Sequence, residues 1–158
     1  MIEGNISVEE FKDSAGTELG PSDWLLVDQD RINLFADATN DHQFIHVDAD
    51  KAAATPFGST IAHGFLSLSL VSNLVGQITL IPEGTVMGLN YGLDKVRFLQ
   101  PVKVGSRVRA HARINKVSAR PAGQFLAKST VTIEIENEDR PALVAELLAL
   151  YIVKSPQK

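Results

Sequence analysis

Two aspartates and two histidines lie within nine residues of one another, in the segment "NDHQFIHVD" at positions 40–48. Side chains of these types can bind a metal ion or transfer protons. The alternative is an ordinary polar loop, in which Asp41 caps a turn and His46 fills a partly buried slot. The choice among these three hypotheses decides most of what the sequence indicates about function.

A metal site would use His42 and His46, which are four residues apart and would share one face of a helix. The preceding helix is expected to end near Asn40, however, and "FIHVD" alternates as an extended chain does. With the helix broken, the two imidazoles have no reason to converge, and no third ligand stands out nearby. We therefore expect no metal at this loop.

An acid–base pair would use Asp41 and His46, which bracket a loop of four residues. Such a loop can fold back so that the carboxylate and the imidazole meet over one small molecule, most simply a water. The pair could then take a proton from the water and return one elsewhere. Histidine suits this role because its unperturbed pKa lies near neutrality. On spacing alone, the acid–base pair and the polar loop both stay open.

The elements that must position this loop are expected to be helices. Residues 22–41 predict a short strand and then a helix, with Asp28 or Asp30 as N-cap and Asn40 as a left-handed stop. Residues 48–54 predict a second short helix, closed by Pro56 and Gly58. Residues 60–78 place apolar side chains in nearly every direction around a helix, which is typical of a buried helix.

The second half of the chain changes to the period of strands. Residues 106–115 and 128–136 alternate at every second position, and "ARPAGQ" between them predicts the turn of a long hairpin. Residues 87–102 predict an earlier strand that ends at Pro101, whereas 142–153 has a composition that favours helix on propensity alone. Helices followed by antiparallel strands indicate the α+β class, with the sheet wrapped around the apolar helix.

Composition restricts the class of protein further. A chain of 158 residues with 44 % hydrophobic and 22 % charged residues fits one soluble globular domain over 1–158. The absence of cysteine excludes disulfides, thiolate nucleophiles and cysteine zinc sites. The first ten residues lack a signal-peptide pattern, and no apolar run is long enough to span a membrane. The net charge of −4 argues against nucleic acid as a partner, and a cytoplasmic location is the default expectation.

Two separated blocks, both inside "FADATNDHQFIHVDADKAAATPFGSTIAHGFLSLSL", carry a family resemblance. The aromatic Phe35 precedes Asp41, four residues follow, and then comes His46. The second block begins with His63 and Gly64. In content and order these blocks resemble the signature of the MaoC-like hydratases, the (R)-specific enoyl-CoA hydratases of hot-dog fold, and most closely their nodulation protein N-like branch.

The resemblance extends over residues 16–153, because "NYGLDKVRF" and the Pro-Val pair at 101–102 resemble the first long strand of the family. It implies a curved antiparallel sheet around a long buried helix, and it makes the ambiguous segment 142–153 the last strand. The better-known hydratases have Asn-Pro where this chain has Gln43 and Phe44. The nodulation protein N-like branch resembles this version of the loop.

The resemblance also implies a reaction. Asp41 and His46 would hold a water that adds across the double bond of a trans-2-enoyl-CoA, giving (R)-3-hydroxyacyl-CoA reversibly. The N–H of Gly64, at the positive end of the buried helix, would stabilise the enolate-like thioester oxygen. No cofactor is expected beyond the coenzyme A of the acyl-CoA substrate, and a homodimer is expected.

Three further residues are expected near the substrate. Gln43 has an amide that can donate a hydrogen bond. His63 either orients the loop or lines the pocket. Ser69 aligns with a serine near the acyl group in relatives, although a small residue that packs a crowded helix is an equal alternative.

Two rival functions stay open on the same fold: an acyl-CoA thioesterase and a non-catalytic acyl-CoA or acyl-carrier binding protein. The acid–base pair favours an enzyme over a binding protein. Arg107 and Arg109 are expected opposite Glu134 and Glu136 across the hairpin, as ordinary cross-strand ion pairs. The remaining candidates for the phosphates of coenzyme A are Lys95, Arg97 and Lys103. His42 and His111 are expected to have no functional role.

Overall fold

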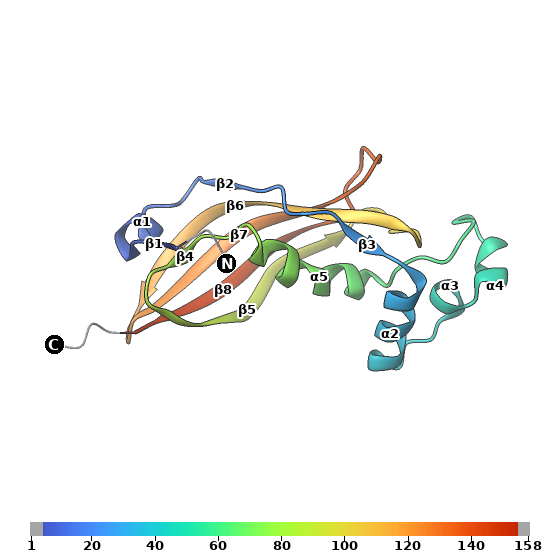
Figure 1. Cartoon of the computed structure of the whole chain (residues 1–158), viewed down its shortest axis with the longest axis horizontal. Coiled ribbons are helices and arrows are strands. Elements are labelled where there is room, and N and C mark those ends of the chain that lie inside the picture. The colour runs from blue at the N-terminus through green and yellow to red at the C-terminus, as the bar shows by residue number, and fades with distance from the viewer. Residues whose placement is uncertain (1–4, 155–158) are drawn as a thin grey trace.

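The computed structural model describes residues 5–154 (Figure 1). The first four residues of the N-terminal segment considered above, together with 155–158, lie outside the described residues. The helices are α1 (Val8–Lys12), α2 (Gln29–Thr39), α3 (Phe44–Val47), α4 (Ala49–Ala53) and α5 (Gly64–Gly76). The strands are β1 (Asn5–Ile6), β2 (Glu18–Leu19), β3 (Leu25–Val27), β4 (Ile81–Pro82), β5 (Thr85–Phe98), β6 (Ser106–Arg120), β7 (Gln124–Ile135) and β8 (Leu143–Val153).

One antiparallel sheet contains the long strands, in the order β2-β6-β7-β8-β5, and β3 also pairs with β6. The predicted hairpin is confirmed as β6 and β7, whose turn has Ala122 and Gly123 at positive φ. The ambiguous last segment is strand β8 because it forms backbone ladders with both β7 and β5, which override its helix-favouring composition. β1 and β4 form a separate parallel pair.

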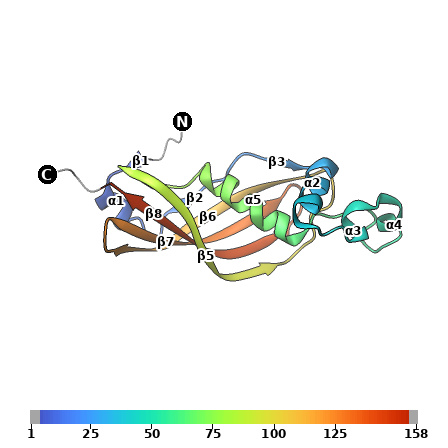
Figure 2. The same ribbon diagram turned by 90° about the horizontal axis from the view of Figure 1, so that it is seen from below.

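Helix α5 lies along one face of the curved sheet, as Figures 1 and 2 show. The main core forms between its buried side chains and the inward residues of β6, β7 and β8. Alternation at every second residue places Val108 and Ala110 of β6, and Val131 and Ile133 of β7, on this inner face. The predicted α+β class and hot-dog arrangement are therefore confirmed.

The expectation that α5 is buried all round is wrong for one side of the helix. Leu66, Leu70 and Leu74 are buried against the sheet, but the side chain of Phe65 is 68 % exposed and Ser69 is exposed. The sheet curves around only part of the helix. A helix that is apolar all round is therefore not necessarily covered on all sides by its own chain.

The helices before α5 are confirmed, with one correction. Asp28 caps α2 by accepting a hydrogen bond from the Arg31 N–H at 2.9 Å, and Asn40 ends it at φ 57°. The expectation of extended chain after residue 43 is wrong, because Phe44–Val47 forms the single-turn helix α3. A five-residue alternation is too short to separate strand from helix. Docking decides the conformation here, since the Ile45 carbonyl accepts a hydrogen bond from the Ile61 N–H at 3.0 Å.

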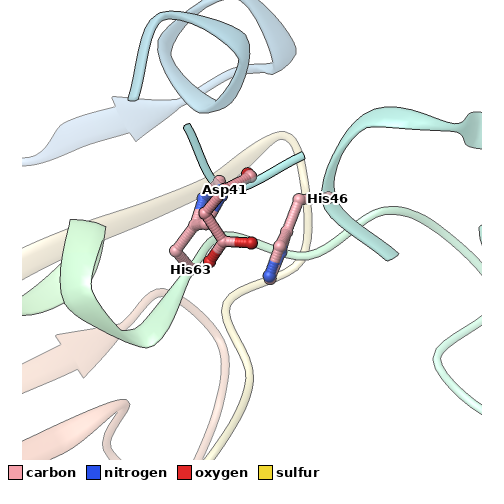
Figure 3. A group of neighbouring side chains, drawn as sticks. All are labelled: Asp41, His46 and His63. Carbon is pink, nitrogen blue, oxygen red and sulfur yellow. The ribbon is translucent and has the colours of Figure 1, made fainter. Parts of the chain in front are cut away.

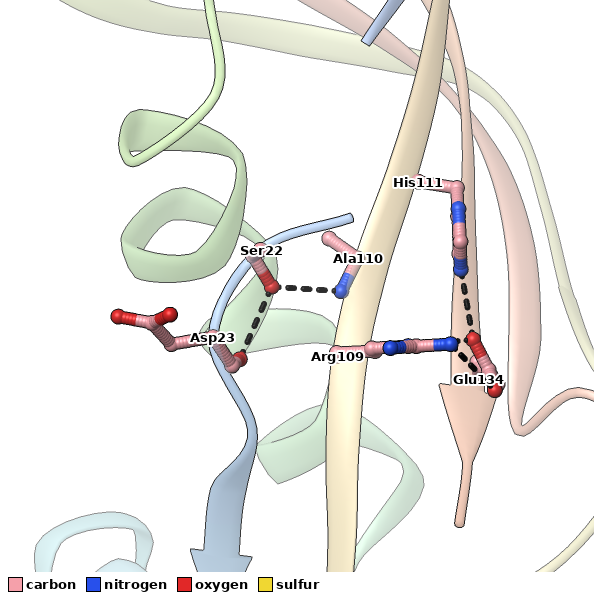
Figure 4. A network of polar contacts seen from close by, with 6 residues as sticks. All are labelled: Ser22, Asp23, Arg109, Ala110, His111 and Glu134. Atoms are coloured by element: carbon pink, nitrogen blue, oxygen red, sulfur yellow. Dashed lines mark hydrogen bonds and ion pairs between the residues drawn. The ribbon is translucent and has the colours of Figure 1, made fainter. Parts of the chain in front are cut away.

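The outer face of the sheet carries the expected ion pairs, of which Figure 4 shows the one between Arg109 and Glu134. Arg107 pairs with Glu136, and Arg109 Nε donates to Glu134 at 2.7 Å. His111 Nε2 lies 2.6 Å from the same Glu134 carboxylate. These arginines therefore stabilise the sheet, as the cross-strand spacing predicted. Within residues 5–154, no helix combines the length and hydrophobicity needed to cross a membrane.

Leu74 of α5 provides a test of this packing. It is fully buried in the main core, so Leu74→Ala should lower the free energy of unfolding by about 2–5 kcal/mol. The matched control is Leu34→Ala on α2, where the side chain is 69 % exposed and the change should stay within about 0.5 kcal/mol. Urea denaturation at one fixed protein concentration measures both. Equal losses from the two variants would contradict the placement of α5 on the sheet.

Candidate active site

Three titratable side chains from separate segments meet at the end of the molecule that carries α2, α3 and α4 (Figures 1 and 3). Asp41 follows α2, His46 lies in α3, and His63 directly precedes α5. One carboxylate oxygen and one nitrogen from each ring lie within 4.8 Å of one another. His46 and His63 are buried, whereas Asp41 is exposed. The loop therefore brings Asp41 and His46 together as predicted, and it adds His63.

Hydrogen bonds to the backbone fix the position and tautomer of His46. Its Nδ1 lies 2.7 Å from the Ile61 carbonyl, which can only accept, so Nδ1 carries the hydrogen and Nε2 has the lone pair. Gln29 at the start of α2 donates to the His46 carbonyl at 2.8 Å. Thr60 in turn donates to the Gln29 side chain at 2.6 Å. His46 is therefore set to accept a proton at Nε2.

The surroundings of His46 favour its neutral form. Burial lowers the pKa of His46 below its ordinary value, and the nearby His63 ring lowers it further. The hydrogen bond to the Ile61 carbonyl and the Asp41 carboxylate oppose this shift without overcoming it. Since the net direction of the pKa shift is downward, His46 is an unprotonated imidazole at neutral pH, the form that a general base requires.

His63 joins the two halves of the pair. Its Nε2 donates to the backbone carbonyl of Asp41 at 2.9 Å, and its ring stacks on His46 with centroids 3.8 Å apart. Phe35 covers the ring at 5.0 Å. The Nδ1 of His63 is buried with no hydrogen-bond partner in the described part of the chain. Of the two roles expected for His63, the contacts match orientation of the loop.

Gly64 begins α5 immediately after His63, and no group within residues 5–154 accepts a hydrogen bond from its N–H. Gly64 and His46 line one cavity of about 320 Å³, whose other walls include Ser67, Phe98 and Val102. A Cβ at position 64 would lie 3.2–3.3 Å from the Phe98 ring, so a larger residue would narrow the cavity. The helix N-terminus is therefore open to a ligand that also reaches His46.

Three loop and helix residues lie apart from this cluster. The Gln43 side chain is exposed and makes no capping hydrogen bond at the start of α3. Ser69 donates to the Phe65 carbonyl at 2.7 Å and lines a different cavity, of about 230 Å³, between α5 and β5. His42 pairs with Asp37 at 2.7 Å and does not converge with His46.

Sequence reasoning missed several residues that shape the site. Gln29 and Thr60 hold the backbone of His46, Ser67 lines the cavity one turn into α5, and Phe98 packs against Gly64. Only Ser67 carried a signal, since it is three residues after Gly64 and thus on the same side of the helix. The other contacts join segments that are far apart in the sequence.

Comparison with known proteins identifies the class. Residues 10–137 match the model of the MaoC like domain. Nodulation protein N of Rhizobium leguminosarum bv. viciae is 53 % identical over 147 residues, covering 92 % of this chain and 91 % of that protein. The 3-hydroxyacyl-thioester dehydratase Z of Mycobacterium tuberculosis is 47 % identical over 146 residues, covering 92 % and 96 %.

A solved structure agrees with these relatives. The (R)-hydratase from A. caviae involved in PHA biosynthesis superposes with a TM-score of 0.66 and 27 % identity, over 85 % of this chain and 94 % of that one. The chain therefore belongs to the MaoC-like family of hydratases and dehydratases. It is an enzyme of the hydro-lyase class.

The surroundings of His46 lead to a direct measurement. Because burial lowers the pKa of His46, this group should titrate below the ordinary value of 6.5. Protonation should therefore be complete only at more acidic pH than for an unperturbed histidine. NMR of ring carbon–hydrogen pairs, assigned by the loss of one signal in His46→Gln, measures the value. A midpoint at or above 6.5 would contradict the buried, neutral placement of this ring.

Proposed function

We propose that this enzyme adds water across the double bond of a trans-2-enoyl-CoA to give an (R)-3-hydroxyacyl-CoA, and catalyses the reverse dehydration. The observation that carries the proposal is the meeting of Asp41 and His46 beside an open N–H at Gly64. Hydration of an enoyl thioester needs a base for the water, a proton for Cα and a donor for the thioester oxygen. Asp41 and His46 together supply the first two, and the Gly64 N–H supplies the third.

In the proposed mechanism, the reacting water lies between the Asp41 carboxylate and His46 Nε2. His46 takes one proton while the water oxygen bonds to Cβ, and the electrons of the double bond move toward the thioester carbonyl. The imidazolium then returns that proton to Cα. The Asp41 carboxylate accepts a hydrogen bond from the second O–H of the water. It also stabilises the transient positive charge on His46. The atoms balance with water alone, so we propose that no metal or other cofactor takes part.

The N–H of Gly64 is proposed to stabilise the developing oxyanion. It lies at the N-terminus of the 13-residue helix α5, where unpaired N–H groups and the helix dipole favour negative charge. Gly64 and His46 line the same cavity of about 320 Å³, which supports a thioester lying against both groups. Glycine at this position keeps the space beside the Phe98 ring open for the substrate.

The relatives support the substrate class and the stereochemistry. One is named a 3-hydroxyacyl-thioester dehydratase, and a similar solved structure is an (R)-hydratase. Coenzyme A is proposed as the carrier. Of the three cationic candidates, Lys103 is best placed for its phosphates, because it lines a cavity that shares Gln100 and Pro101 with the cavity at His46. Lys95 and Arg97 lie outside both cavities.

Removal of either member of the pair tests the mechanism. Asp41→Asn and His46→Gln should each slow hydration of trans-2-butenoyl-CoA by roughly 10²–10⁴-fold, the usual contribution of an acid–base group. His42→Gln is the matched control in the same loop and should keep wild-type turnover. Loss of the conjugated absorbance measures the rate, and circular dichroism checks folding. Near-normal turnover in both pair variants would place the active site elsewhere.

The same assay separates a hydratase from a thioesterase. The two reactions differ in whether the water attacks Cβ or the carbonyl carbon, a displacement on the order of 2–3 Å, and even ~1 Å has a large effect on rate. Hydration should remove the absorbance without releasing a free thiol, and an (R)-specific dehydrogenase should oxidise the product. Release of coenzyme A at a comparable rate would assign a thioesterase instead.

We also propose that the enzyme is a homodimer. Within residues 5–154, strand β5 pairs only with β8 and is an edge strand, and many of its large apolar side chains are exposed. The exposed Phe65 of α5 packs against Phe98 of β5, with ring centroids 5.9 Å apart, and extends this surface. A second copy is the partner that the edge strand and this apolar surface fit best. The exposed members on β5 are Val86, Met87, Leu89, Tyr91, Leu93 and Phe98.

Sedimentation equilibrium tests the dimer. The wild-type mass should be about twice 17.1 kDa. Leu89→Asp should shift the equilibrium toward the monomer because it puts a carboxylate into the apolar surface. Leu34→Asp, on the exposed side of α2, is the control and should leave the mass unchanged. A wild-type monomer with full activity would refute the proposed dimer.

A further inference from the structure

Asp41, His46 and His63 together form a set of ligand types that zinc binds in proteins. Two imidazoles and one carboxylate, with a fourth position left open, occur in zinc sites that bind water or substrate. One ligand atom from each residue lies within 4.8 Å of the other two. The expectation against a metal rested on His42 and His46. The structure replaces His42, which pairs with Asp37, by His63 from a distant segment.

Each histidine is also oriented as metal-ligating histidines are. Such residues usually donate one ring N–H to a backbone carbonyl or carboxylate, which leaves the other nitrogen for the ion. His46 donates from Nδ1 to the Ile61 carbonyl at 2.7 Å, and His63 donates from Nε2 to the Asp41 carbonyl at 2.9 Å. Both remaining nitrogens are therefore lone-pair acceptors.

The remaining nitrogen of His63 is the most specific sign of a ligand. Its Nδ1 has no hydrogen-bond partner within residues 5–154, although the side chain is only 3 % exposed. Buried polar atoms are nearly always paired, so an unpaired one needs an explanation. The acid–base mechanism does not use this atom, since it needs only Nε2 of His46 and the carboxylate of Asp41. A cation bound by both histidines would satisfy it.

We propose that Asp41, His46 Nε2 and His63 Nδ1 bind one Zn²⁺ ion, and that the bound ion inhibits the enzyme. The inhibition rests on the proposed function, because the ion would occupy the position of the reacting water and the lone pair of the base. The binding itself does not rest on it. Imidazole ligands favour Zn²⁺ and its transition-metal neighbours, whereas Mg²⁺ prefers oxygen ligands.

Binding requires the two imidazole rings to reorient, because each lone pair lies in the plane of its ring and the two planes are only 22° from parallel. Zinc–nitrogen bonds of about 2.0–2.1 Å require the three ligand atoms to approach to roughly 3.4 Å in a tetrahedral site. The stacked rings of His46 and His63 must tilt apart to share the ion. Asp41 is exposed, so its side chain has room to follow them.

Direct binding tests the site without reference to activity. Chelator-treated, dialysed protein is titrated with ZnCl₂ by calorimetry and with Co²⁺ by visible absorption. One ion per chain should bind, and Asp41→Asn, His46→Gln and His63→Gln should each weaken binding at least tenfold. His42→Gln and His111→Gln are matched controls, since each of these histidines also has a carboxylate partner, and both should bind as the wild type does.

No Zn²⁺ binding, or binding lost in a control variant and kept in the cluster variants, would refute the site. If His63→Gln fails to fold, Asp41→Asn still tests it, because Asp41 is exposed.

Turnover tests the inhibition. Stoichiometric Zn²⁺ should abolish hydration of trans-2-butenoyl-CoA, excess chelator should restore it, and Mg²⁺ should have no effect. Full activity of the zinc-loaded protein would refute inhibition. A metal-free protein that is inactive on every enoyl-CoA would instead refute the proposed function and leave the binding result intact.

Discussion

The hydrogen bond between His46 and the Ile61 carbonyl is the contact on which the arrangement of the site depends. It sets the tautomer of His46 and ties α3 to the segment that leads into α5. The same segment continues into His63, which donates a hydrogen bond to the Asp41 carbonyl, and into Gly64, which is the first residue of α5. The stretch is held in turn by the bond from the Ala62 N–H to the Val102 carbonyl at 2.8 Å. One backbone segment therefore positions His46, Asp41 and the helix N-terminus together.

Burial of His46 has two consequences that act in opposite directions. It lowers the pKa of the imidazole and so keeps a proton acceptor available at neutral pH, but it also removes the ring from water. The cost is offset where each polar atom finds a partner, as Nδ1 does at the Ile61 carbonyl. His63 lacks such a partner at Nδ1. The cluster that we propose to hold one water between a carboxylate and an imidazole therefore also presents a third, unsatisfied acceptor. This is why the proposed catalytic site and the proposed zinc site share two residues.

Helix α5 links the site to the rest of the fold. Its N-terminus faces the cavity, its buried side packs on β6 and β7, and its exposed side continues into the apolar residues of β5. The sheet fixes the axis of the helix and hence the direction of its dipole at Gly64. In the proposed dimer, the second copy would cover the exposed side as far as Phe98, which also lines the cavity at the N-terminus. Packing and catalysis would then use different parts of the same helix.

The sequence by itself indicated most of the long elements and named Asp41 and His46 as a candidate acid–base pair. Period-two alternation identified β6 and β7, Asp28 and Asn40 marked the ends of α2, and the spacing of Asp41, His46, His63 and Gly64 carried the family resemblance. These features are local, so short stretches of sequence are enough to reveal them. Only the tertiary structure decided that Phe44–Val47 is helical, that one side of α5 is exposed and that His63 joins the pair. Each of these depends on contacts between segments far apart in the chain, such as Ile45 with Ile61 and Asp41 with His63. Whether such contacts form depends on how the distant segments are placed relative to each other in space, and a short stretch of sequence does not contain that information.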